Sequence, residues 1–202
     1  MRNLAILIFD EVEVLDFAGP FEVFAVCGLR TGEEQPFNVY TVAQKELITA
    51  RNGLKIVPHY LLHNCPAPDI LLLPGGGGNY PDGTPFGSRR EMNNESLLEW
   101  IREKNKTVEL LLSVCTGSLL LGKAGLLEGL SATTHWKAVD TMKAAAPNTN
   151  ILPDQRWVDN GRIILSAGIS AGIDMSFYII SKLLGKEAAD ETAEYMQYDH
   201  WK

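Results

Sequence analysis

The chain has 202 residues, 46% of them hydrophobic, and its 18 basic and 25 acidic side chains give a net charge of −7. This length predicts a single domain over residues 1–202, with enough apolar side chains to form a core without disulfides or a structural metal. The acidic balance argues against a nucleic-acid partner, which needs clustered positive charge. The apolar stretches, such as residues 4–9, fall far short of the roughly twenty residues that span a bilayer, so we expect no membrane partner.

Short apolar runs alternate with longer amphipathic segments along the first half of the chain. The pattern predicts a strand at 4–9, a helix at 19–29 that begins at Gly19-Pro20, a strand at 37–43, a hairpin at 46–58 that turns at Asn52-Gly53, and an apolar strand at 69–78 that ends in four glycines. Proline is favoured in the first turn of a helix, and Asn-Gly is favoured in the turn of a hairpin.

The second half of the chain continues the same alternation. We expect helices at 93–106, 116–127, 137–146, 170–185 and 186–198, strands at 107–114 and 130–136, and a hairpin at 156–166. Strands that are apolar along their whole length are typical of a parallel sheet that helices cover on both faces. The sequence therefore predicts a single α/β sandwich.

The three cysteines, Cys27, Cys65 and Cys115, are an odd number and form no CxxC pair. This usage is typical of free thiols in a reducing compartment, so we expect a cytoplasmic protein without a disulfide framework. Cys27 falls in an apolar helical stretch, which favours a core position, and Cys65 falls in a loop. His59, His63 and Cys65 lie close together in the sequence but lack a fourth ligand, so we expect no metal site.

Cys115 lies between an apolar strand and an apolar helix, with small residues on either side. Ser113 and Gly117 flank it at the spacing of a nucleophile elbow, the tight strand-to-helix turn that exposes a catalytic side chain. There the partial positive charge of the helix N-terminus favours a thiolate, and the N–H groups of Thr116 and Gly117 are candidate donors to an oxyanion. Cys115 could instead be a packed core thiol, since free cysteine is often buried.

Three stretches of the chain resemble the ThiJ/PfpI superfamily, whose members share the class I glutamine amidotransferase fold. They are FDEVEVLDFAGPFEVF at 9–24, LLLPGG at 71–76 and SVCTGSLLLGKAGLLEGLSATTHW at 113–136. The resemblance covers about residues 3–185 and is strongest to the isocyanide hydratase branch, which also includes the amino-terminal domains of some AraC-type regulators. It implies a flavodoxin-like three-layer sandwich with a mostly parallel sheet.

The same resemblance implies a set of site residues. They are Cys115 as the nucleophile, Thr116 as the residue that follows it in the hydratases, Asp16 as the acid that faces it, Gly75 and Gly76 as the backbone of the oxyanion site, and His135 as a histidine found in several members. An acid beside a thiolate is pushed toward its protonated form, so Asp16 could donate a proton near neutral pH. Asp16 could also cap the first helix, and His135 could be purely structural.

The function that the resemblance implies is a cysteine-dependent hydro-lyase. Such an enzyme adds water to a small-molecule isocyanide and releases an N-substituted formamide, with no metal or organic cofactor; the resemblance also implies a homodimer. Thr116 stands where the protease-like members carry a histidine base, which disfavours peptidase activity. The distant histidine–glutamate pair of the amidotransferases is not evident, because the C-terminal His200 is expected to fray.

Other functions stay open at this point. A reactive thiol beside a carboxylic acid is also an oxidation site, so the chain could be a redox or stress sensor without enzymatic activity. It could also be a ligand-binding domain of the AraC-regulator type. Glyoxalase or deglycase chemistry is disfavoured, because those members usually carry a glutamate at the position of Asp16.

Overall fold

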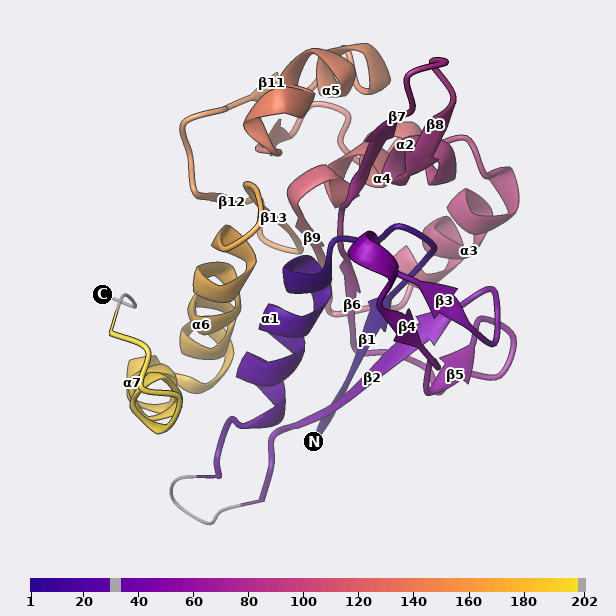
Figure 1. The fold of residues 1–202 in the computed structure, drawn as a ribbon. Helices are drawn as coiled ribbons and strands as arrows, with labels where there is room; N and C mark the ends of the chain where they lie inside the picture. Colours follow the sequence, from indigo (N-terminus) through magenta and orange to yellow (C-terminus); the bar gives the residue numbers. More distant parts are fainter. Residues whose placement is uncertain (30–33, 200–202) are drawn as a thin grey trace.

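The apolar runs of the sequence pair into one central sheet. The computed structural model describes residues 1–29 and 34–199, and seven strands lie in the order β12-β13-β9-β6-β1-β2-β5 (Figure 1). Their bounds are β1 Arg2–Leu7, β2 Phe37–Ala43, β5 Tyr60–Leu61, β6 Ile70–Leu73, β9 Leu110–Val114, β12 Trp157–Asp159 and β13 Ile163–Ser166. Neighbouring strands are parallel except β12 and β13. The central strands β6 and β9 are buried along their whole length, which explains their continuous apolar sequence.

Helices cover both faces of this sheet and complete three layers. Figure 1 shows α1 (Val14–Ala25), α6 (Ala171–Leu184) and α7 (Lys186–Tyr195) on one side, and α3 (Glu95–Asn105) and α4 (Ser118–Lys123) on the other. The short α2 (Ser88–Glu91) and α5 (Val139–Ala145) contact α4. Buried apolar side chains of the sheet and the helices form one continuous cluster. The structure is therefore the predicted flavodoxin-like sandwich with a mostly parallel sheet.

The first helix begins earlier than the sequence predicts. We expected its start at Gly19-Pro20, but α1 begins at Val14 and Pro20 lies in its interior. Proline has no N–H to donate to the carbonyl four residues before it, so the helix loses one hydrogen bond there. Packing against α6 offsets this loss, and Gly19 lies so close to Ile173 that a Cβ would collide with that side chain. Asp16 is consequently inside the first turn of α1 and not ahead of the helix.

The glycine run does not extend the strand that precedes it, contrary to the prediction for 69–78. β6 ends at Leu73, and Gly76 and Gly77 have φ angles of +110° and +108°, which turn the chain out of the sheet. A small antiparallel hairpin of β7 (Gly77–Asn79) and β8 (Pro85–Gly87) follows and leads into α2. The sequence analysis did not predict this hairpin.

The other predicted elements are present, with ends that differ by several residues. Both predicted hairpins form, β3 (Ile48–Thr49) with β4 (Lys55–Ile56) and β12 with β13, and Asn52, Gly53 and Gly161 have positive φ in their turns. The helix predicted at 116–127 is the shorter α4. Single 3-10 turns lie at Arg51–Gly53, Cys115–Gly117 and Trp136–Ala138, and β10 (Ser131–Ala132) pairs with β11 (Asn150–Ile151).

Neither a membrane span nor a metal cluster is found in the described residues. No helix there combines the length and the hydropathy that crossing a bilayer requires. Within the same ranges, no three His, Cys, Asp or Glu side chains gather as metal ligands would. The three cysteines are free thiols, as predicted. His200 lies outside the described residues.

Candidate active site

Cys115 occupies a sharp turn between β9 and α4. Its φ angle is +57°, in the left-handed region that residues other than glycine seldom adopt. The Cys115 N–H donates a hydrogen bond to the Ala167 carbonyl at 3.2 Å. The Cys115 carbonyl oxygen accepts hydrogen bonds from Ser118 Oγ at 3.0 Å and from Thr134 Oγ1 at 3.1 Å. A strained residue that its surroundings hold in this way is typical of an active site, and the predicted nucleophile elbow is present.

Gly117 lets the ends of β6 and β9 meet at this turn. Its φ of −59° is ordinary for any residue, so the backbone conformation does not require glycine. A Cβ at this position would overlap the carbonyl oxygen of Leu73, the last residue of β6. Glycine is therefore needed for space. The role of the Gly117 N–H as an oxyanion donor stays a prediction.

Asp16 is fully buried in the first turn of α1 and lies next to Cys115. Its Oδ2 accepts a hydrogen bond from the Gly75 N–H at 3.0 Å, and its Oδ1 has no hydrogen-bond partner in the described part of the chain. Burial raises the pKa of Asp16 to about 7, against the opposing effects of the Gly75 N–H and the Cys115 thiol. The carboxyl group therefore contacts Gly75 at the end of β6 and the Cys115 side chain, and does not cap α1.

The Cys115 side chain is only 5% exposed, and its pKa is raised. Burial is the largest cause and the Asp16 carboxylate is the next, while the N–H groups of Thr116 and Ile169 act in the opposite direction. The prediction of a thiolate stabilised by the helix N-terminus is therefore wrong for the resting site. Burial and the neighbouring acid both disfavour the charged thiolate. Near neutral pH the thiol keeps its proton, and Asp16 is close to its titration midpoint.

Thr116, Gly76 and Ser88 form a closed ring of hydrogen bonds beside Cys115. The Gly76 N–H donates to Thr116 Oγ1 at 3.0 Å. Ser88 Oγ lies 2.7 Å from Thr116 Oγ1 and 2.6 Å from the Gly76 carbonyl oxygen. The ring holds Thr116 at the lining of the cavity in front of Cys115. Sequence analysis missed Ser88, because it reaches the site only through the hairpin of β7 and β8.

Gly75 and Gly76 position side chains and do not present free N–H groups. The resemblance assigned them to an oxyanion site, but the Gly75 N–H is already bound to Asp16. The Gly76 N–H is likewise bound to Thr116. A Cβ on Gly75 would overlap the backbone nitrogen of Thr116, and a Cβ on Gly76 would overlap that of Glu13. The glycines therefore allow the close approach that holds Asp16 and Thr116 in place.

His135 lines the cavity and also makes structural contacts. Its Nδ1 accepts a hydrogen bond from the Lys137 N–H at 3.2 Å, and its ring packs where a Cβ on Gly168 would lie. Burial, followed by the charges of Lys137 and Arg89, lowers the pKa of His135. The ring is therefore neutral near pH 7 with its proton on Nε2, since Nδ1 is an acceptor. A contribution of His135 to catalysis stays a prediction.

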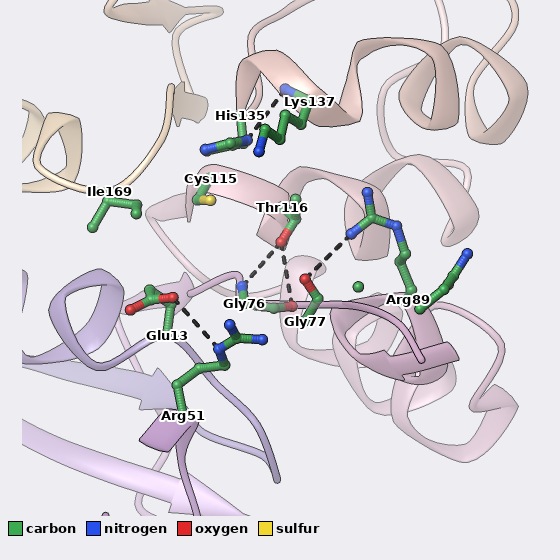
Figure 2. A pocket seen from close by; sticks show the side chains of 12 residues that line it. Glu13, Arg51, Gly76, Gly77, Arg89, Cys115, Thr116, His135, Lys137 and Ile169 are labelled. Carbon is green, nitrogen blue, oxygen red and sulfur yellow. Dashed lines mark hydrogen bonds and ion pairs between the residues drawn. The ribbon is translucent and has the colours of Figure 1, made fainter. Parts of the chain in front are cut away.

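The elbow, Thr116 and His135 surround a cavity of about 380 Å³ (Figure 2). A volume of this size fits a small organic molecule. A sequence profile of the DJ-1/PfpI family matches residues 2–182. The chain belongs to the DJ-1/PfpI family. The resemblance seen in the sequence is thereby confirmed.

Relatives within the DJ-1/PfpI family include an enzyme and a regulator. The chain is 32% identical to the isonitrile hydratase of Pseudomonas putida over 97% of this chain and 78% of that protein. It is 25% identical to the HTH-type transcriptional regulator GbdR of Pseudomonas aeruginosa over 98% of this chain and 51% of that protein. A crystal structure of a ThiJ/PfpI family protein from Pseudomonas syringae matches with a TM-score of 0.83 at 28% identity, over 98% of this chain and 75% of that chain.

The structure adds lining residues to this DJ-1/PfpI site that the sequence analysis missed. They are Glu13, Arg51, Asn79, Arg89, Lys137 and Ile169. Four of them lie in or beside features that the sequence had marked: Glu13 is inside the motif at 9–24, Asn79 follows the glycine run, Arg51 precedes the Asn52-Gly53 turn, and Lys137 follows the motif that contains His135. The others come from separate segments of the chain, so no local pattern connects them to Cys115.

Proposed function

We propose that this protein is a cysteine-dependent hydro-lyase that adds water to an isocyanide and releases an N-substituted formamide. The observation that carries the proposal is the geometry of the pair: Cys115 lines the cavity at a turn with a φ of +57°, and the fully buried Asp16 carboxyl, whose pKa burial raises to about 7, lies next to it. A relative aligned over 97% of the chain is an isonitrile hydratase, which supports the same substrate class.

The first half of the proposed reaction attaches the substrate to the protein. The Cys115 sulfur bonds to the terminal isocyanide carbon while the thiol proton passes to the Asp16 carboxylate. Asp16 then delivers this proton to the same carbon, which leaves a thioimidate with a C–S single bond and a C=N double bond. A carboxyl group with a pKa near the working pH is suited to both proton transfers.

The second half of the reaction consumes water. The water oxygen bonds to the thioimidate carbon, and one water proton passes to the nitrogen with Asp16 as the carrier. The C–S bond then breaks, the hydroxyl proton returns to the sulfur, and the C=O bond forms, so that formamide and free thiol result. Thr116, held by Gly76 and Ser88, positions the reacting groups.

Conversion of alkyl and aryl isocyanides to formamides tests the proposal. We expect turnover by the wild-type protein and a loss of kcat/KM of about a thousandfold in Cys115→Ser and in Asp16→Asn, because each removes a group that exchanges bonds or protons with the substrate. Cys65→Ser is the matched control, since this half-buried thiol lies in another loop, and it should keep the wild-type rate. Absence of formamide from every isocyanide with fully reduced wild-type protein would contradict the proposal.

The alternative functions have less support. Oxidation of a sensor thiol proceeds through the thiolate, and burial raises the pKa of Cys115, which disfavours that form. The regulator GbdR is a relative at 25% identity, against 32% for the isonitrile hydratase. Glyoxalase or deglycase chemistry is supported by nothing beyond the same thiol. The homodimer and the cytoplasmic location stay predictions.

A further inference from the structure

Three basic side chains, Arg51, Arg89 and Lys137, line the cavity in front of Cys115. They come from the turn between β3 and β4, from α2, and from the 3-10 turn before α5, which are far apart in the sequence. Figure 2 shows the three side chains on different sides of the space beside Thr116. Their gathering at one cavity stands out in a chain whose net charge is −7.

The protein neutralises these cations only in part. Glu13 is the only carboxylate among the described lining residues, and its Oε2 lies 3.9 Å from Arg51 Nε. Arg89 donates a long hydrogen bond of 3.4 Å to a backbone carbonyl, and the Lys137 ammonium lies 4.9 Å from the centre of the Trp136 ring. Over residues 1–29 and 34–199, neither Arg89 nor Lys137 has an ion pair with a carboxylate. The cavity therefore carries an excess of positive charge.

We infer that the substrate carries a carboxylate, which Arg51, Arg89 and Lys137 bind while its reactive carbon meets Cys115. This inference rests on the proposed function, under which the substrate is an isocyanide with a carboxylate substituent. Arginine presents its N–H groups in a fork that matches the two carboxylate oxygens, and charge-assisted hydrogen bonds are stronger than neutral ones. Glu13 beside Arg51 makes a singly charged group a better fit than a doubly charged phosphate.

A matched pair of substrates tests the inference. Isocyanoacetate carries a carboxylate, and its methyl ester has the same reactive group without the charge. We expect kcat/KM for isocyanoacetate to exceed that for the ester by about tenfold, and Arg89→Met or Lys137→Met to remove most of this preference. Lys143→Met, at an exposed position of α5 outside the cavity, is the control and leaves the preference unchanged. Equal kcat/KM for the two substrates would overturn the inference and leave the proposed function standing.

Alkylation of Cys115 measures whether the cavity prefers an anionic reagent over a neutral one, and it does not depend on turnover of an isocyanide. Iodoacetate and iodoacetamide are similar in size, but only iodoacetate carries a negative charge. Each reagent forms a C–S bond with the cysteine as its C–I bond breaks; iodide leaves and the thiol proton goes to solvent. Mass spectrometry reports the rates at Cys115 and at Cys65 in the same molecule. We expect the ratio of the iodoacetate rate to the iodoacetamide rate to be about tenfold higher at Cys115 than at Cys65. The ratio at Cys115 should fall in Lys137→Met.

The two experiments separate the inference from the proposed function. A high ratio at Cys115 without turnover of either isocyanide supports the anion site and contradicts the hydratase. If the ratio of the iodoacetate rate to the iodoacetamide rate is equal at Cys115 and Cys65 and is unchanged in Lys137→Met, the anion site is overturned. This holds whether or not the isocyanides are converted.

Discussion

Asp16 and Cys115 are neighbours, and the pKa values of both groups are raised. Burial moves the titration of Asp16 to about pH 7, and the Asp16 carboxylate in turn raises the pKa of the thiol. In the proposed reaction, attack by sulfur is coupled to transfer of the thiol proton to Asp16, because the raised pKa of Cys115 disfavours a free thiolate. The proposed reaction therefore needs no separate histidine base of the kind that the protease-like members carry after their cysteine.

The pKa of Asp16 predicts the pH dependence of turnover. The carboxylate form has to accept the thiol proton, so we expect kcat/KM to fall as the pH drops below about 7 and to level off above it. Initial rates of formamide formation between about pH 5 and about pH 9 measure this profile. A profile that is flat across this range would show that Asp16 does not accept the proton.

Asp16 also lowers the stability of the fold at alkaline pH. The folded-state pKa of Asp16 is about 7 against an ordinary value of 3.8, so between these values the folded state binds more protons and stability falls as the pH rises. Asp16→Asn removes the buried charge and keeps an oxygen for the Gly75 N–H. We expect it to raise the free energy of unfolding by about 2 kcal/mol near pH 8, and by much less near pH 4. Urea denaturation measures both values, and an equal change at the two pH values would argue against this account.

The elbow depends on two strands that end side by side. β6 and β9 are parallel neighbours, so their carboxyl ends bring the glycine run next to Cys115. Gly117 is a point of close approach, since the space beside it is filled by the Leu73 carbonyl. Cys115 itself adopts the left-handed conformation, which lets the helix start immediately after the strand.

Replacing Gly117 tests this close approach. We expect Gly117→Ala to lower the free energy of unfolding by about 3 kcal/mol, because the new Cβ would overlap rigid backbone. Gly125→Ala, just beyond α4, is the comparison: its φ is +74° with open space around the Cβ position, so it should lose only about 1 kcal/mol from backbone conformation. Equal losses in the two variants, measured by urea denaturation, would contradict the close approach.

At the scale of the whole molecule, the chain is acidic and its cavity is basic. The net charge is −7, yet the described lining holds three cations and one carboxylate. The fold produces this contrast, because it brings together residues near positions 51, 89 and 137 that are remote in the sequence. A local positive potential inside an acidic protein favours anionic ligands, and the proposed carboxylate-bearing substrate is an anion.

Local patterns predicted the elements whose signals are local. The turn at Asn52-Gly53 formed as expected, because asparagine and glycine tolerate the positive φ that both residues adopt there. The start of α1 was wrong, because packing against α6 keeps Pro20 inside the helix. The hairpin of β7 and β8 was missed, because three-residue strands rich in glycine have no alternation of apolar and polar side chains.

By itself, the sequence determined the fold class, the family and the elbow at Cys115, since apolar runs and motif spacing are properties of residues close together in the chain. Only the tertiary structure decided that the pKa of Cys115 is raised, that the N–H groups of Gly75 and Gly76 are already bound, and that the cavity is lined with cations. Burial sets the pKa values, and contacts between remote segments set the hydrogen bonds, and neither is present until the chain has folded.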